Sequence, residues 1–182
     1  MAKLRIGVIG AGTMGALNAR LACENPDTVL VGICDLQETR ALSLGEKYEV
    51  PAYSSVEDMI QSASCEAVVV ATPDFAHLAP FLTAVREGCH ILIEKPLAMD
   101  LLEAEQMVTA ASAAGITVQV TFTNRWTPAY VTAHERLVSG ELGNVLAINA
   151  RQNNTILTPT LMLPWAHQTG PHWFLMSHSL DL

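Results

Sequence analysis

Short apolar runs that alternate with helix-forming segments constrain the fold of this chain more than any other feature. The runs are rich in Val, Ile and Leu and nearly continuous in hydrophobicity, which is typical of strands buried on both faces of a parallel sheet. This alternation predicts an α/β fold with right-handed crossovers and a doubly wound, mostly parallel sheet. The expected strands are residues 4–9, 29–34, 67–71, 90–93 and 116–122, with 51–53 as a short addition.

Two of the intervening helices have recognisable ends. Asp100 stands three residues before Glu103, a spacing that resembles a capping box, and Gly115 follows as a left-handed stop. A second helix is expected to close at Gly88. The residues expected to face the core are Leu101, Ala104, Val108 and Ala111 in the first helix, and Phe75, Leu78, Leu82 and Val85 in the second.

A glycine-rich turn with the spacing G-x-G-x-x-G follows the first expected strand and opens a helix. In that context Gly10 permits the tight turn, Gly12 lets the backbone approach a pyrophosphate, and Gly15 lets the helix pack against the strand. The backbone N–H groups at the helix start, at Thr13 and Met14, would then meet the phosphate charge. The spacing alone fits an ordinary turn, but between a strand and a helix it predicts a dinucleotide site.

Asp35 ends the second expected strand, twenty residues after Gly15. A carboxylate there can accept hydrogen bonds from the adenosine ribose hydroxyls and would repel a 2′-phosphate, which favours NAD over NADP. Arg40 keeps NADP as the alternative. Asp35 could also act as the N-cap of a helix beginning at Leu36, and the two roles are compatible.

The composition excludes several kinds of partner. Ten Lys and Arg against 18 Asp and Glu give a net charge of -8 with no basic cluster, which argues against binding to nucleic acid or to an anionic membrane. No apolar run reaches the length of a membrane-spanning helix, and we identify no targeting segment. Four cysteines without C-x-x-C spacing are expected to be reduced core residues, which fits a cytoplasmic protein. They are Cys23, Cys34, Cys65 and Cys89.

Two polar motifs follow expected strands at the carboxyl edge of the sheet, ATPDFAH after 67–71 and EKPLA after 90–93. Ligands of open α/β sheets bind outside this edge, so Lys95 is well placed for chemistry. Pro96 keeps Lys95 out of a helical conformation and makes the turn abrupt. By itself, Lys95 also fits a surface lysine with a packed stem and a hydrated ammonium group.

Five motifs together resemble the Gfo/Idh/MocA family of NAD(P)-dependent oxidoreductases, which act mostly on sugars and polyols. In chain order they are GVIGAGTMG, ATPDFAH, EKPLA, TNRWTPAY and GELGNV, and the resemblance covers essentially the whole chain. It implies a Rossmann dinucleotide-binding domain over residues 1–122. Residues 123–182 would then be the incomplete start of a second α/β domain, which binds substrate and forms a homo-oligomer through its sheet.

The resemblance assigns roles to individual residues. Lys95, in the E-K-P motif with Glu94, would contact the substrate and the nicotinamide ribose, and the Lys95–Pro96 peptide bond would be cis. Asn124 and Arg125 would lie close to the cofactor and the substrate. The residues implied to line the nicotinamide side are Thr72, Pro73 and His77.

The segment FLMSHSLD resembles the family's D-x-G-x-H-x-x-D motif, which implies that His178 is the catalytic base. Phe174 replaces the first aspartate and Met176 the glycine, so the usual orienting carboxylate is absent from its position. We expect Asp181, His172 or a group beyond the present chain to substitute for it.

A histidine base with a nearby ammonium group is a coherent pair for removing a proton from an alcohol and stabilising the developing alkoxide. Taken alone, His178 also fits a core or capping histidine. Its proximity in sequence to His167 and His172 raises a metal site as a further alternative, but the spacing matches no zinc pattern and cysteine ligands are lacking, so we expect no metal.

Beyond residue 122 we expect a helix from Pro128 to about Ser139, with Gly140 as its stop, and a strand over 145–150. The whole pattern predicts an NAD-dependent dehydrogenase of a sugar or polyol. Two alternatives remain open, an NAD-dependent glycoside hydrolase of the same broad family and a non-catalytic NAD-binding module.

Overall fold

The computed structural model describes residues 2–153, 155, 157–163, 165–170 and 172–181. The chain divides into two compact units, Met1–Val120 and Thr121–Leu182.

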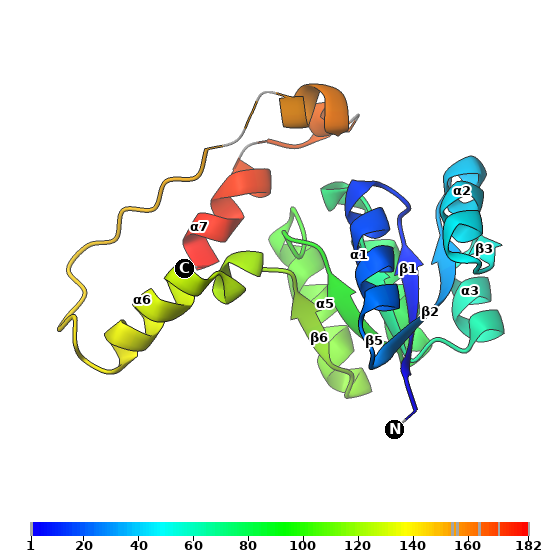
Figure 1. Cartoon of the computed structure of the whole chain (residues 1–182), viewed down its shortest axis with the longest axis horizontal. Coiled ribbons are helices and arrows are strands. Elements are labelled where there is room, and N and C mark those ends of the chain that lie inside the picture. The colour runs from blue at the N-terminus through cyan, green and yellow to red at the C-terminus, as the bar shows by residue number, and fades with distance from the viewer. Residues whose placement is uncertain (1, 154, 156, 164, 171, 182) are drawn as a thin grey trace. The chain divides into compact units, whose positions relative to one another are not determined.

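The first unit is built on a six-stranded, fully parallel sheet in the order β3-β2-β1-β4-β5-β6 (Figure 1). This confirms the predicted α/β fold, with every expected strand of the unit present. The central β1 lies between β2 and β4, so the winding direction of the sheet reverses there. The strands are β1 (Leu4–Ile9), β2 (Thr28–Cys34), β3 (Ala52–Tyr53), β4 (Ala67–Val70), β5 (His90–Ile93) and β6 (Val118–Val120).

Helices cover both faces of this sheet, because successive strand side chains point to opposite sides. Val68 and Val70 belong to the core beneath α3, α4 and α5, whereas Val69 belongs to the core beneath α1 and α2. Burial on both faces accounts for the continuous apolar runs in the sequence. The helices are α1 (Thr13–Glu24), α2 (Glu38–Tyr48), α3 (Val56–Ala63), α4 (Leu78–Arg86) and α5 (Leu101–Ala114).

The predicted helix ends are present. The Asp100 side chain accepts hydrogen bonds from the backbone N–H groups of Leu102 (2.8 Å) and Glu103 (3.3 Å). Gly115 ends α5 with φ +66°, and Gly88 follows α4 with φ +73°.

The predicted buried faces of these two helices are partly wrong. In α5 the buried residues are Met107 and Ala111, whereas Leu101 and Val108 are 71% and 60% exposed. An apolar, alanine-rich helix offers two overlapping apolar faces, and the larger Met107 side chain takes the core side. Phe75 is also exposed, because a separate 3-10 turn, η1 (Asp74–Ala76), precedes α4.

The second unit contains α6 (Pro128–Val138), which follows a 3-10 turn, η2 (Thr123–Trp126), and α7 (Ser177–Asp181). Gly140 follows α6 with φ +80°, as predicted. The strand predicted over 145–150 is wrong. No described residue of this unit is in a strand, and an apolar segment becomes a strand only when a neighbour pairs with its backbone.

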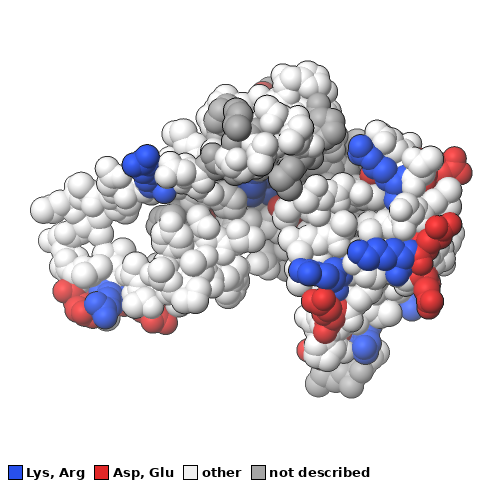
Figure 2. Space-filling view, turned by 45° about the horizontal axis from the view of Figure 1, so that its top comes forward, with Lys and Arg blue, Asp and Glu red and all other residues white. Residues whose placement is uncertain are grey.

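The described residues also show how the cysteines, the apolar helices and the charged side chains are distributed. Cys34 and Cys89 are buried, whereas Cys23 is exposed, and all four cysteines are free thiols. No helix in the described ranges is both long and apolar enough to span a bilayer. On the face drawn in Figure 2, several lysines and arginines stand beside acidic residues, and the basic groups form no continuous area.

Candidate functional site

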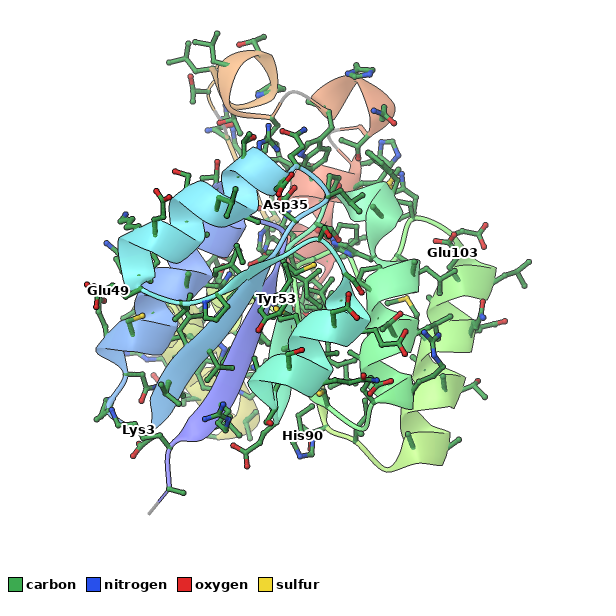
Figure 3. The ribbon with its side chains drawn as sticks, turned by 90° about the vertical axis from the view of Figure 1, so that its right-hand side faces the viewer. Lys3, Asp35, Glu49, Tyr53, His90 and Glu103 are labelled. Atoms are coloured by element: carbon green, nitrogen blue, oxygen red, sulfur yellow. The ribbon has the colours of Figure 1, made fainter. Side chains whose placement is uncertain are left out.

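The loops that leave β1, β2, β4 and β5 all emerge at the carboxyl edge of the sheet. Figure 3 shows Asp35 at this end of the strands and Lys3 and His90 at the other. β2 and β4 flank β1 on opposite sides, so the loops that follow β1 and β4 run away from each other. In doubly wound sheets a ligand crevice opens between two such loops.

The three glycines of the turn after β1 have different environments. Gly10 has φ +96°, and a Cβ there would come within 2.6 Å of the Ala71 carbonyl oxygen. A Cβ on Gly15 would come within 1.7 Å of the Gly10 carbonyl oxygen, so the start of α1 packs directly on the turn. A Cβ on Gly12 would meet no atom within 4 Å. Gly10 and Gly15 are thus required by the fold itself, whereas Gly12 borders open space.

The start of α1 has the properties of an anion site. Gly12 is its N-cap and supplies no side-chain acceptor, and the first turn carries no acidic residue. Thr13 and Met14, the first two helical residues, are both exposed. Backbone N–H groups at such an uncapped helix start attract phosphate oxygens. These properties of the turn are compatible with a bound pyrophosphate.

Asp35 lies immediately after β2 and is fixed by two backbone groups. Its Oδ2 accepts from the Ala11 N–H and its Oδ1 from the Gln37 N–H, both at 2.7 Å. The helix that follows begins at Glu38 with Gln37 as N-cap, so the alternative of an N-cap for a helix starting at Leu36 is wrong. The carboxylate is instead tied to the glycine turn itself, at the β2 side of the crevice.

The loop after β4 holds Thr72, Pro73 and His77. The Thr72 hydroxyl donates to the Ala76 carbonyl at 3.0 Å and closes the loop on itself. The His77 side chain is only 1% exposed, and its ring nitrogens face backbone carbonyls rather than solvent.

The loop after β5 begins with Glu94 and Lys95, and the Lys95–Pro96 bond is cis, as the resemblance implied. Glu94 is 8% exposed, and its carboxyl group accepts from the Asn18 side-chain amide at 3.2 Å. The same amide donates to the Met14 carbonyl at 2.9 Å. Asn18 thus links α1 to the E-K-P segment. No motif in the sequence points to Asn18, although it lies in α1 about one turn after Gly15.

Lys95 lies in an unusual electrostatic environment. Burial lowers the pKa of its ammonium group below the ordinary value of 10.5, while the carboxylates of Asp74 and Glu94 act in the opposite direction. An ammonium group that is easier to deprotonate is suited to exchanging protons with a ligand.

In the second unit, Arg125 donates from Nε to Asp181 Oδ2 at 2.7 Å and from Nη2 to Oδ1 at 2.5 Å. Its guanidinium carbon also lies 5.5 Å from the centre of the Phe122 ring. His178 meets the same ring edge-on, at 6.4 Å between centroids. Both carboxylate oxygens of Asp181 therefore accept hydrogen bonds from Arg125. A substitute for the carboxylate missing at Phe174 would instead have to orient His178.

The remaining predicted residues, Asn124 and His172, lie in the second unit. Asn124 lies in η2, where its backbone carbonyl accepts from the Thr127 N–H at 3.0 Å. His172 stacks at a tilt on Trp173, with 5.3 Å between centroids. Lys95 belongs to the first unit and His178 to the second, so each is placed only within its own unit. In the described part of the chain, no three His, Cys, Asp or Glu side chains gather into a cluster that could hold a metal ion.

The chain is similar in sequence to several curated dehydrogenases. D-glucoside 3-dehydrogenase from Escherichia coli is 30% identical over 150 residues, 81% of this chain and 43% of that protein. Inositol 2-dehydrogenase from Rubrobacter xylanophilus is 32% identical over 165 residues, 90% of this chain and 48% of that protein. The chain therefore spans about half the length of the curated relatives it matches.

A solved structure is similar in fold as well. GenD2 from gentamicin A biosynthesis, in complex with NAD, superposes with a TM-score of 0.73 at 26% identity, covering 78% of this chain and 40% of that one. The model of the oxidoreductase family with an NAD-binding Rossmann fold matches residues 4–122, more than half of the chain. The glycine turn, the parallel sheet and the E-K-P loop lie in this matched region, and the chain belongs to the Gfo/Idh/MocA oxidoreductase family.

Proposed function

We propose that this chain carries the coenzyme-binding part of an NAD-dependent dehydrogenase that oxidises a secondary hydroxyl group of a sugar or polyol. The observation that carries the proposal is the turn after β1, where Gly10 and Gly15 are closely packed and Gly12 alone borders open space. A turn of this form at an uncapped helix start is suited to a diphosphate.

NAD rather than NADP is the proposed coenzyme. The pyrophosphate would lie against the N–H groups of the first turn of α1, and the adenosine ribose beside Asp35. That carboxylate is fixed by Ala11 and Gln37, so it cannot easily turn away from an incoming 2′-phosphate. Asp35 thereby supports selection against NADP.

Bound NAD would accept the hydride that leaves the alcohol carbon. The chain itself would have to hold the hydroxyl group, remove its proton and exclude water. We propose His178 as the base and Lys95 as the group that stabilises the developing alkoxide. The lowered pKa of Lys95 supports this role, since a partly desolvated ammonium group interacts more strongly with an anion.

The proposed substrate class comes from the relatives. Their names, inositol 2-dehydrogenase and D-glucoside 3-dehydrogenase, both specify a numbered position on a polyhydroxylated molecule. We therefore propose a cyclic polyol or sugar with several equivalent-looking hydroxyl groups. The homo-oligomer expected from the resemblance belongs to the same proposal. Light scattering, which measures the molar mass in solution, tests it.

The direct test is a titration of the 182-residue protein with NADH and, in parallel, with NADPH. We expect micromolar binding of NADH and binding of NADPH at least tenfold weaker, about 1.4 kcal/mol. In Asp35→Ser we expect the preference between the two coenzymes to shrink. Absence of NADH binding at millimolar concentration would overturn the proposed function, and equal affinity for both coenzymes would overturn the choice of NAD.

A further inference from the structure

His77 is one of the few polar side chains in the core of the first unit. It is 1% exposed, at the start of α4, immediately after the loop that leaves β4. Histidine is seldom buried so completely unless its ring nitrogens have hydrogen-bond partners. The partners of this ring therefore indicate what the residue does.

The ring nitrogens face two different loops. Nδ1 lies 2.9 Å from the Pro96 carbonyl oxygen and 3.3 Å from that of Leu97, in the loop after β5. Nε2 lies 3.1 Å from the Thr72 carbonyl oxygen, in the loop after β4. The imidazole ring thus spans the gap between the two loops that leave the neighbouring strands β4 and β5.

All three partners are acceptors. A neutral imidazole donates from one nitrogen only, whereas the imidazolium form donates from both. Each neutral tautomer therefore donates a hydrogen bond to one loop only and leaves its other nitrogen, itself an acceptor, against a carbonyl oxygen of the other loop, whereas the imidazolium form donates to both. Both ring nitrogens face backbone carbonyl oxygens, so neither is available to a ligand. An effect of His77 on ligand binding therefore has to pass through the two loops that it joins.

We propose that His77 is a positioning residue that fixes the Lys95–Pro96 turn against the Thr72–Pro73 turn and thereby preforms the nicotinamide end of the coenzyme site. The inference rests on the proposed function for its ligand, but the link between the loops is a property of the chain alone. The two halves of a dinucleotide lie over opposite sides of the central crevice. With Asp35 on the β2 side, the loops after β4 and β5 serve the nicotinamide half.

Three variants separate positioning from ordinary core packing. His77→Leu keeps an apolar side chain in the core and removes both ring nitrogens. His77→Asn restores a donor near the position of Nδ1, on the Pro96 side only. Phe81→Leu is the control, because Phe81 is also 1% exposed in α4 but has no polar side-chain atom.

Two ligands distinguish the nicotinamide end of the proposed coenzyme site from its adenosine end. NADH needs the nicotinamide end, whereas adenosine diphosphate carries only the adenosine and diphosphate groups. We expect His77→Leu to weaken NADH binding about tenfold in calorimetry and to leave adenosine diphosphate binding within about twofold of wild type. His77→Asn should retain an intermediate NADH affinity, and Phe81→Leu should affect both ligands alike or neither.

Hydrogen exchange without any ligand tests the link independently of the proposed function. In His77→Leu, amides in peptides covering 72–77 and 94–98 should exchange at least about tenfold faster, while those of α1 stay unchanged. Unchanged exchange in both loops, or an equal loss of affinity for NADH and adenosine diphosphate, would overturn the inference. Wild-type protein that binds neither ligand would instead overturn the proposed function, and the exchange result would still decide whether His77 joins the loops.

Discussion

At the scale of single residues, the glycines of the first turn separate the requirements of binding from those of folding. Gly12 has φ -78° and ψ -165°, a conformation open to any residue, and a Cβ there would meet nothing within 4 Å. We predict that Gly12→Ala keeps the melting temperature within about 2 °C of wild type and weakens NADH binding at least about tenfold, because the methyl group enters the space needed by the diphosphate.

Gly15→Ala is the matched comparison. Its Cβ would come within 1.7 Å of a backbone carbonyl oxygen, so the helix start has to move. We expect a loss of about 3 kcal/mol or more in the free energy of unfolding, measured in urea. A Gly12→Ala protein that melts like Gly15→Ala, or a Gly15→Ala protein as stable as wild type, would contradict this division.

Lys95 gives a pH-dependent prediction. Because its folded-state pKa is lowered, the unfolded chain holds this proton more tightly between the lowered value and 10.5. Below this interval the buried charge lowers the free energy of unfolding by its full amount, and above it the deprotonated side chain no longer lowers it. Relative to Lys95→Met, the wild-type protein should gain stability as the pH rises from 8 to 10.5. Melting curves of both proteins across this range test it, and a gap that stays constant would contradict it.

The residues of the site differ in how far the sequence predicts them. Gly10, Gly12 and Asp35 occupy fixed spacings after strands, so their position follows from the pattern. Asn18 and the two-loop contacts of His77 depend on how α1 and the loops after β4 and β5 meet in space. No spacing along the chain encodes such contacts between distant segments.

At the scale of elements, the strands of the first unit were predictable because burial on both faces leaves continuous apolar runs. The same logic failed at 145–150, where an apolar run has no neighbouring strand among the described residues. It also failed for the buried face of α5, because Leu101, Val108 and Met107 are all apolar and periodicity alone cannot choose between them. The sequence pattern predicts which residues form a helix or strand more reliably than it predicts what that helix or strand packs against.

The N-terminus of α5 offers a test at this scale. Asp100 accepts from two backbone N–H groups, so Asp100→Ala should lower the free energy of unfolding by about 1 kcal/mol and the melting temperature by about 3 °C. Asp100→Ser should recover most of this loss, since a hydroxyl oxygen can also accept at an N-cap. An alanine variant as stable as wild type would show that the cap contributes nothing measurable.

At the scale of the whole molecule, the proposed coenzyme contacts of the glycine turn, Asp35 and Lys95 all lie in the unit Met1–Val120. We predict that a chain ending after Phe122 folds cooperatively and binds NADH within about threefold of the 182-residue protein. Urea unfolding followed by both circular dichroism and the fluorescence of Tyr48 and Tyr53, with an NADH titration, would test this. Non-coincident transitions or a large loss of affinity would mean that the second unit is needed.

The distribution of thiols in the first unit has a practical consequence. Burial raises the pKa of Cys34 and Cys65 to about 11, and Cys89 is buried as well, so these groups resist alkylation at neutral pH. Cys23 alone among the four is exposed, and it lies in the last turn of α1, at the opposite end of the helix from the proposed diphosphate site. A maleimide dye should therefore attach at Cys23 without mutagenesis and label the unmodified sequence at a point remote from the proposed coenzyme site.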